Sequence, residues 1–172
     1  MIDFAGHDLR PPGGATGGQA QVELIHHDGR QGLEAADLLP VDPSGPSVVS
    51  YYDTAGKTED VLPSGSTLYV ADGDLGGLVI LDMTDMYRMS LLGSYDTAGY
   101  TVGVQGAGNY ILAADMNEGL VLLDVRTPSA PQETGLYPTT GFSNGVFLAG
   151  SLAFVAEGEA GLSIYAFCVP AL

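Results

Sequence analysis

The chain has 172 residues, about the size of one domain, and carries 5 Lys and Arg against 21 Asp and Glu, a formal net charge of −16. This acidity excludes nucleic-acid binding by phosphate neutralisation and attraction to an anionic membrane surface, because both need clusters of basic side chains. Only 15% of the residues are charged, 45% are hydrophobic, and the 25 glycines follow no collagen period. This composition is typical of short buried segments joined by many tight turns.

The N-terminal residues 1–18 form a segment of their own that ends in the Gly- and Pro-rich linker RPPGGATGG at 10–18. They show neither the basic nor the apolar region of a signal peptide, and no apolar run in the chain reaches the roughly 18 residues of a membrane span. The single cysteine, Cys168, permits no internal disulfide.

Residues 19–172 are internally repetitive. The dipeptide Gly-Leu recurs at Gly32, Gly77, Gly119 and Gly161, with spacings of 45, 42 and 42 residues. A second marker, YDTAG at 52–56 and 95–99 and YPTTG at 137–141, has spacings of 43 and 42 residues. Two independent markers with one period indicate four repeats, at about 19–56, 57–99, 100–141 and 142–172.

Each repeat is predicted to consist of strands. The first contains strands at 22–25, 33–37 and 47–52 and lacks an innermost strand, unless residues 2–4 supply it across the linker. The third has four strands, at 101–106, 109–114, 120–125 and 132–137, and the fourth has three, at 144–148, 152–156 and 161–167. Four strands in about 42 residues are typical of a β-propeller blade. The predicted fold is therefore all-β, a propeller-type array of four blades with a degenerate first blade and an incomplete last one.

The segments GLVILD (77–82) and GLVLLDVRTPSAP (119–131) resemble the LVIVD repeat. The fourth repeat resembles it through GLSIYAF, and the first departs from it, with Glu34 and Ala35-Ala36 in place of large apolar residues. The resemblance spans about residues 20–168 and implies a β-propeller. It also implies export or surface association in bacteria or archaea, but it implies no chemistry.

Three assemblies fit four repeats. Because propellers have about 4–8 blades, the favoured expectation is a homodimer in which two chains join head to tail into one eight-bladed ring. The alternatives are a fragment or short open array, whose strand-rich edge would need a partner, and a closed four-bladed monomer.

Acidic turns recur between the second and third strands of the repeats. Their oxygen-bearing residues, with Asp28 in the first repeat, would gather on one rim of a ring and could bind calcium, which takes 6–8 oxygen ligands. The alternative is that a tight turn simply favours these residue types. The candidate ligands are Asp72, Asp74, Asp115, Asn117, Glu118, Glu157 and Glu159. No other cofactor is expected.

Two further repeated features have a structural and a functional interpretation. Asp37, Asp82 and Asp124 end the third strands and are expected to cap the turn that follows. The YDTAG-type segments, with Tyr52, Asp53 and Thr54 and their equivalents Tyr95, Asp96, Thr97, Tyr137 and Thr139, link one blade to the next. They are expected to pack between blades, with a ligand-binding surface as the alternative.

Nothing else in the sequence indicates catalysis. Neighbouring residues on a strand face opposite sides, so His26 and His27 would not converge on a metal. No nucleophile elbow, P-loop or Rossmann fingerprint occurs. The positions that break the repeat symmetry, Glu34, Arg88, Arg126 and the His26-His27-Asp28 segment, all have surface explanations.

The sequence therefore favours a non-catalytic propeller that acts as a binding or structural module for a protein or glycan ligand. A propeller enzyme with lyase or hydrolase chemistry at carboxylates of the central channel, with calcium, is the alternative. Depleted lysine and abundant acid fit a saline environment that screens the charge. The expected location is outside the cell or on its surface, although the cytoplasm of a halophile would favour the same composition.

Overall fold

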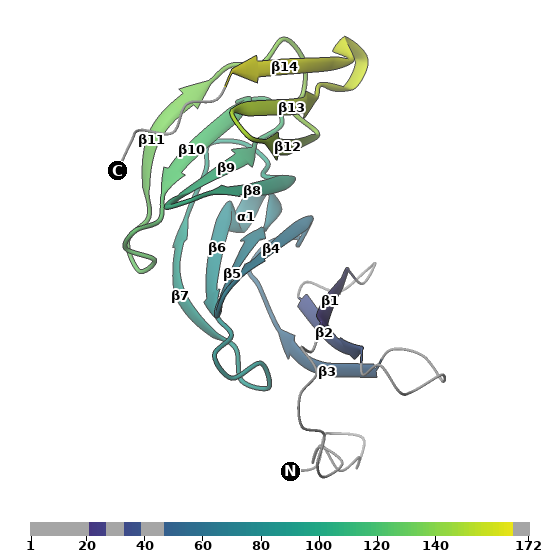
Figure 1. Cartoon of the computed structure of the whole chain (residues 1–172), viewed down its shortest axis with the longest axis vertical. Coiled ribbons are helices and arrows are strands. Elements are labelled where there is room, and N and C mark those ends of the chain that lie inside the picture. The colour runs from purple at the N-terminus through teal and green to yellow at the C-terminus, as the bar shows by residue number, and fades with distance from the viewer. Residues whose placement is uncertain (1–20, 27–32, 39–46, 167–172) are drawn as a thin grey trace.

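A computed structural model describes residues 21–26, 33–38 and 47–166 of the chain. Four antiparallel sheets follow one another along the sequence, and we call them blades 1 to 4 (Figure 1). Blade 1 contains β1 (Gln21–His26), β2 (Leu33–Leu38) and β3 (Ser47–Tyr52); blade 2 contains β4 (Asp60–Ser64), β5 (Thr67–Ala71), β6 (Leu78–Asp82) and β7 (Ser90–Tyr95); blade 3 contains β8 (Gly103–Ala107), β9 (Tyr110–Ala114), β10 (Leu120–Asp124) and β11 (Gln132–Tyr137); blade 4 contains β12 (Gly145–Ala149), β13 (Leu152–Ala156) and β14 (Leu162–Ala166).

The predicted strands and their order within each repeat are confirmed. Every blade is a meander in which strands adjacent in the sequence pair in the sheet. Only two short helices interrupt the described strands, α1 (Gly73–Gly76) in blade 2 and the 3₁₀-helix η1 (Gly158–Ala160) in blade 4. Residues 2–4, considered as an inner strand of the first repeat, and the linker at 10–18 lie outside the described residues.

The blades are arranged as an open arc, as in part of a propeller. The first strands of blades 2, 3 and 4 contact one another, β4 with β8 and β8 with β12, along the inner side of the arc. Figure 1 shows β7 and β11 on the opposite, convex side, with blades 1 and 4 at the two ends. The four described sheets do not close into a ring, so the closed four-bladed alternative is not observed.

The core lies between the blades. From blade 2 to blade 4, apolar residues on one face of a sheet pack against the facing side of the next, and the middle strands β6 and β10 are apolar on both faces, as LVILD and LVLLD predict. Between blades 2 and 3 the buried residues are Ala71, Leu78, Ile80, Val104, Ile111, Ala113, Val121, Leu123 and Val125. Between blades 3 and 4 they are Tyr110, Leu112, Ala114, Leu120, Leu122, Ala153 and Val155. In the described part of the chain, no helix is long and apolar enough to cross a membrane.

Candidate functional site

The YDTAG-type segments are the connectors that lead from the outer strand of one blade to the inner strand of the next, at 53–59, 96–102 and 138–144. Their burial alternates. In the first connector Thr54, Gly56 and Thr58 are buried, while Asp53, Ala55 and Lys57 are exposed. In the second connector Thr97 and Thr101 are buried, Gly99 and Tyr100 are half-buried, and Asp96 and Ala98 are exposed. In the third connector Ser143 is buried. This alternation predicts that a hydrogen-bond acceptor lies beneath each connector.

In blade 3 that partner is Asp115, the acid after β9. Its Oδ1 accepts hydrogen bonds from the hydroxyls of Thr97 at 3.0 Å and Thr101 at 3.1 Å, and its Oδ2 accepts one from the backbone N–H of Gly99 at 2.9 Å. The side chain has no exposed area. One carboxylate therefore holds three alternate residues of the connector, and we call this arrangement an acid pin.

Blade 2 repeats the acid pin with Asp72, which is also fully buried. Its Oδ2 accepts from the N–H of Gly56 at 2.8 Å, and its Oδ1 has a longer contact of 3.5 Å with the hydroxyl of Thr58. The hydroxyls of Thr54 and Thr58 are 3.3 Å apart. The glycine in the middle of the pin is required by space as well, because a Cβ at Gly56 would lie 2.0 Å from the carbonyl oxygen of Asp72.

Blade 4 has a modified pin in which Glu157 replaces the aspartate. The longer side chain accepts hydrogen bonds from the hydroxyls of Thr140 and Tyr165 and, at 3.2 Å, from the N–H of Thr140. These donors hold the pKa of Glu157 below its usual value, with Thr140 the largest cause and Tyr165 the next. The carboxylate is thus kept charged although the side chain is buried.

The turn that begins at each pin acid is closed by the same kind of backbone hydrogen bond. The N–H of Asp72, Asp115 and Glu157 donates to the carbonyl of the residue five or four positions on, Gly77, Gly119 and Gly161, at 2.8, 2.8 and 2.7 Å. These glycines have φ of +56°, +90° and +91°. The repeated Gly-Leu marker therefore reflects a positive φ at the entry to the third strand, where glycine is favoured.

The predicted calcium ligands are divided by this arrangement. Asp72, Asp115 and Glu157 are buried in separate blades and occupied by connector donors, whereas Asp74, Asn117 and Glu159 are exposed and Glu118 is half-buried. Among the described residues, no three His, Cys, Asp or Glu side chains are grouped so that they could hold a metal ion. The calcium site stays a prediction, and Asp28 lies outside the described residues.

The strand-ending aspartates cap the turns that follow them, as expected. Oδ1 of Asp82 accepts from the N–H of Thr84 at 2.8 Å, and Oδ1 of Asp124 accepts from the N–H of Arg126 at 3.0 Å. The pKa of Asp82 is lowered by its hydrogen bonds to Thr84, and that of Asp124 by its hydrogen bonds to Arg126. Asp37 lies in β2.

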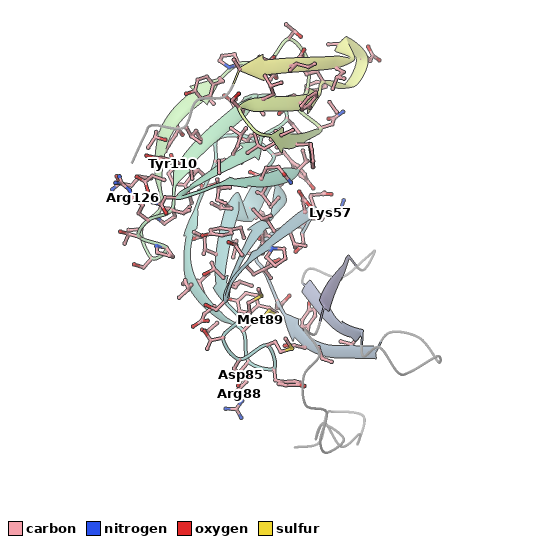
Figure 2. The ribbon with its side chains drawn as sticks, in the orientation of Figure 1. Lys57, Asp85, Arg88, Met89, Tyr110 and Arg126 are labelled. Atoms are coloured by element: carbon pink, nitrogen blue, oxygen red, sulfur yellow. The ribbon has the colours of Figure 1, made fainter. Side chains whose placement is uncertain are left out.

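Arg126 and Arg88, which break the repeat symmetry, are exposed on outer turns (Figure 2). Arg126 pairs with Asp124, its Nε at 2.9 Å from Oδ2, and both line a shallow hollow with Thr127, Ala130 and Gln132. His27 lies outside the described residues and His26 ends β1.

Sequence reasoning missed a polar group between blades 2 and 3. Glu59 accepts from the hydroxyl of Tyr100 at 2.7 Å and from Nζ of Lys57 at 2.8 Å. The hydrogen bond to Glu59, followed by burial, raises the pKa of Tyr100 to about 12. Asp60 bridges the inner strands, since its Oδ2 accepts from the N–H of Val104 at 3.0 Å. Aligning the connectors would have shown the signal, because Asp60 stands where the next two repeats have Gly103 and Gly145.

Comparison with known proteins identifies the repeats. The family model described as the LVIVD repeat matches residues 55–97 and 98–139, which are the second and third repeats. The chain is an LVIVD-repeat protein. Each matched segment begins in one connector and ends in the next, so each contains one blade and its pin acid.

Among solved structures, the crystal structure of the computationally designed Ika4 protein is similar, with a TM-score of 0.60 over 90% of this chain and 96% of that chain. Because the two are only 8% identical, this similarity concerns the fold alone. Among curated proteins, no relative matches the LVIVD-repeat chain.

Proposed function

We propose that this β-propeller repeat protein is a non-catalytic binding module that recognises a protein or glycan through its connectors. The observation that carries the proposal is the alternation within each connector. In the first two connectors the acid pins fix the buried residues, and these residue types are nearly the same in every repeat. The exposed residues between them recur as Asp and Ala in the first two connectors and differ in the third. The exposed residues are Asp53, Ala55 and Lys57 in the first connector, Asp96 and Ala98 in the second, and Pro138 and Phe142 in the third.

We call these seven exposed residues the connector face. A backbone held by buried hydrogen bonds can present varied side chains with little entropic cost on binding, which is how rigid scaffolds support recognition loops. The adjoining turns belong to the same surface, because Gly73 pairs with Thr101 and Met116 with Ser143 in isolated bridges. The acids most suited to catalysis by burial, Asp72, Asp115 and Glu157, are engaged in holding the connectors.

The chemistry of the connector face limits its ligand. Asp53, Asp96 and the neighbouring Asp74 are exposed acids, and the exposed Phe142 offers an aromatic surface. With a net charge of −16, the molecule disfavours anionic ligands. A neutral glycan or a basic segment of a protein fits this face better, and both would be met by a module outside the cell or on its surface.

Binding of the full chain to arrays of neutral glycans and of lysine-rich peptides tests the proposal. We expect at least one class to bind, and the paired variant Asp96→Asn with Phe142→Ser to lose at least tenfold in affinity. The matched control, Leu91→Ser with Leu136→Ser, changes exposed residues of the outer strands β7 and β11 and should bind as the native chain does. No binding to either class would contradict the proposal, as would equal loss in the control. Metal-dependent turnover of a glycan or lactone would instead favour the alternative that the protein is an enzyme.

A further inference from the structure

The outer turn of blade 2, which joins β6 to β7, is rich in methionine. Its sequence over residues 83–89 is MTDMYRM, so this turn holds Met83, Met86 and Met89, three of the 5 methionines of the chain. These three side chains are half-buried, whereas the four residues between them are exposed, namely Thr84, Asp85, Tyr87 and Arg88. We call residues 83–89 the methionine turn.

The fold brings the three methionines together. The register of β6 and β7 ends at the pair Asp82 and Ser90, so Met83 and Met89 are the next residues on the two sides of the turn. Both pack against one buried apolar cluster of blade 2, and they therefore lie on the same face of its sheet. Met86 stands midway between them at the tip. Figure 2 shows Asp85 and Arg88 at this tip and Met89 nearer to the sheet.

The corresponding turn of blade 3 has the same backbone hydrogen bond at its tip. In both turns an N–H donates at 2.9 Å to the carbonyl three residues before it, Arg88 to Asp85 and Ala130 to Thr127. The places of the three methionines are taken there by Val125, Pro128 and Pro131. Two of these residues are buried and Pro128 is half-buried. Apolar side chains without sulfur thus pack at all three positions, so packing alone does not explain the methionines.

The shared property of the three side chains is their thioether sulfur. Sulfur is a soft ligand that selects soft ions such as Cu(I), whereas Mg²⁺ and Ca²⁺ take oxygen ligands. The net charge of −16 also attracts cations to this molecule. We propose that the methionine turn binds one Cu(I) ion through the sulfur atoms of Met83, Met86 and Met89. The ion is bound as Cu(I), so no electron is transferred.

This site is independent of the connector face. The methionine turn follows the pair Asp82 and Ser90, whereas the second connector follows Tyr95, which pairs with Leu78 at the opposite end of β6. The two surfaces thus lie at opposite ends of the strands of blade 2. Loss of copper binding would leave ligand binding by the connectors intact, and either proposal can fail alone.

Anaerobic competition for Cu(I) with the chelator bicinchoninate tests the site. The full chain is used in a Cys168→Ser background, because a thiolate also binds Cu(I). We expect one bound ion, and at least a tenfold loss of affinity when Met83, Met86 and Met89 are all replaced by leucine. Leucine nearly conserves the volume of methionine, so the circular dichroism spectrum should not change. No binding, or equal binding by the triple variant, would overturn the proposal.

A matched control is Met116→Leu, which changes a half-buried methionine of blade 3 and should bind Cu(I) as the background protein does. An equal loss in this control would overturn the assignment to the methionine turn. The dependence on pH distinguishes thioethers from histidines, since a thioether need not lose a proton to bind a metal. We expect constant affinity between about pH 8 and 6, whereas ligation by histidine would weaken over this range and would contradict the proposal.

Nuclear magnetic resonance identifies the ligands directly. Ag(I) serves as the probe, because it has the charge and softness of Cu(I) and is stable in air. In protein labelled with ¹³C at the methionine methyl groups, one equivalent should shift the resonances of Met83, Met86 and Met89 and leave that of Met116 unchanged. Single leucine variants assign each resonance. A shift of Met116 without the other three would refute the site.

Discussion

Among the polar groups of this molecule, the carboxylates of the acid pins contribute most to its stability. Asp115 illustrates why, since its carboxylate satisfies two hydroxyls and one backbone N–H in a place with no exposed area. A hydroxyl can rotate to another acceptor, and those of Thr97 and Thr101 already lie 2.7 Å apart. The N–H of Gly99 cannot rotate, and a buried donor without an acceptor is costly.

Replacing Asp115 by alanine should therefore destabilise the protein by about 2–4 kcal/mol, because it leaves fixed donors without a partner and opens a small cavity. Asp96→Ala removes an exposed acid of the same connector and should change the free energy of unfolding by no more than about 0.5 kcal/mol. Urea unfolding followed by circular dichroism measures both. Similar values for the two variants would mean that the pin does not hold the connector.

At the scale of the element, a glycine with positive φ directly precedes the third strand of blades 2, 3 and 4. A Cβ at Gly119 would lie 2.4 Å from the carbonyl oxygen of Tyr137, at the end of the outer strand, and 2.8 Å from the N–H nitrogen of Thr139. Gly161 has almost the same φ, +91° against +90°, yet no described atom lies within 4 Å of its Cβ position. The difference arises because the described part of blade 4 has no fourth strand.

Comparing alanine variants of Gly161 and Gly119 separates the cost of a left-handed backbone conformation from the cost of steric crowding. Gly161→Ala should cost about 1–2 kcal/mol, the price of a left-handed conformation for an L-residue. Gly119→Ala adds a clash with the outer strand and should cost about 1–3 kcal/mol more. Thermal unfolding of the two variants beside the native protein gives the comparison. If the two alanines proved equally destabilising, the close approach of β11 to Gly119 would be refuted.

The strands could be predicted because their signal is local and repeated four times. β10 and β11 follow from an apolar run, a proline-rich turn and a polar segment, and the period assigns their places in the sheet. The pins could not be predicted in this way, because Asp115 meets its donors 14 to 18 residues away and an aspartate in a turn is ordinary in a sequence. The signal was nevertheless present, since Thr-x-Gly-x-Thr precedes Ala-Asp at the same distance in two repeats.

At the scale of the whole molecule, the repeat count could not reveal that blade 4 exposes apolar residues. Phe147, Leu162 and Ile164 lie on the face of blade 4 turned away from blade 3 and have exposed fractions of 62%, 66% and 57%. Net charge and this exposed apolar area oppose each other, since repulsion between acidic copies limits contact through it. The ionic environment should therefore govern both stability and association.

Salt should stabilise the protein by screening its 21 acids, with most of the gain between about 0.01 and 0.2 M, where the Debye length falls from about 30 to below 10 Å. The melting temperature of the full chain, measured over this range of salt, tests this effect. At equal ionic strength CaCl₂ and MgCl₂ should raise it equally, because the pin acids are occupied by protein donors. A rise specific to calcium that vanishes in Asp74→Asn with Glu159→Gln would instead establish a calcium site at the acidic turns.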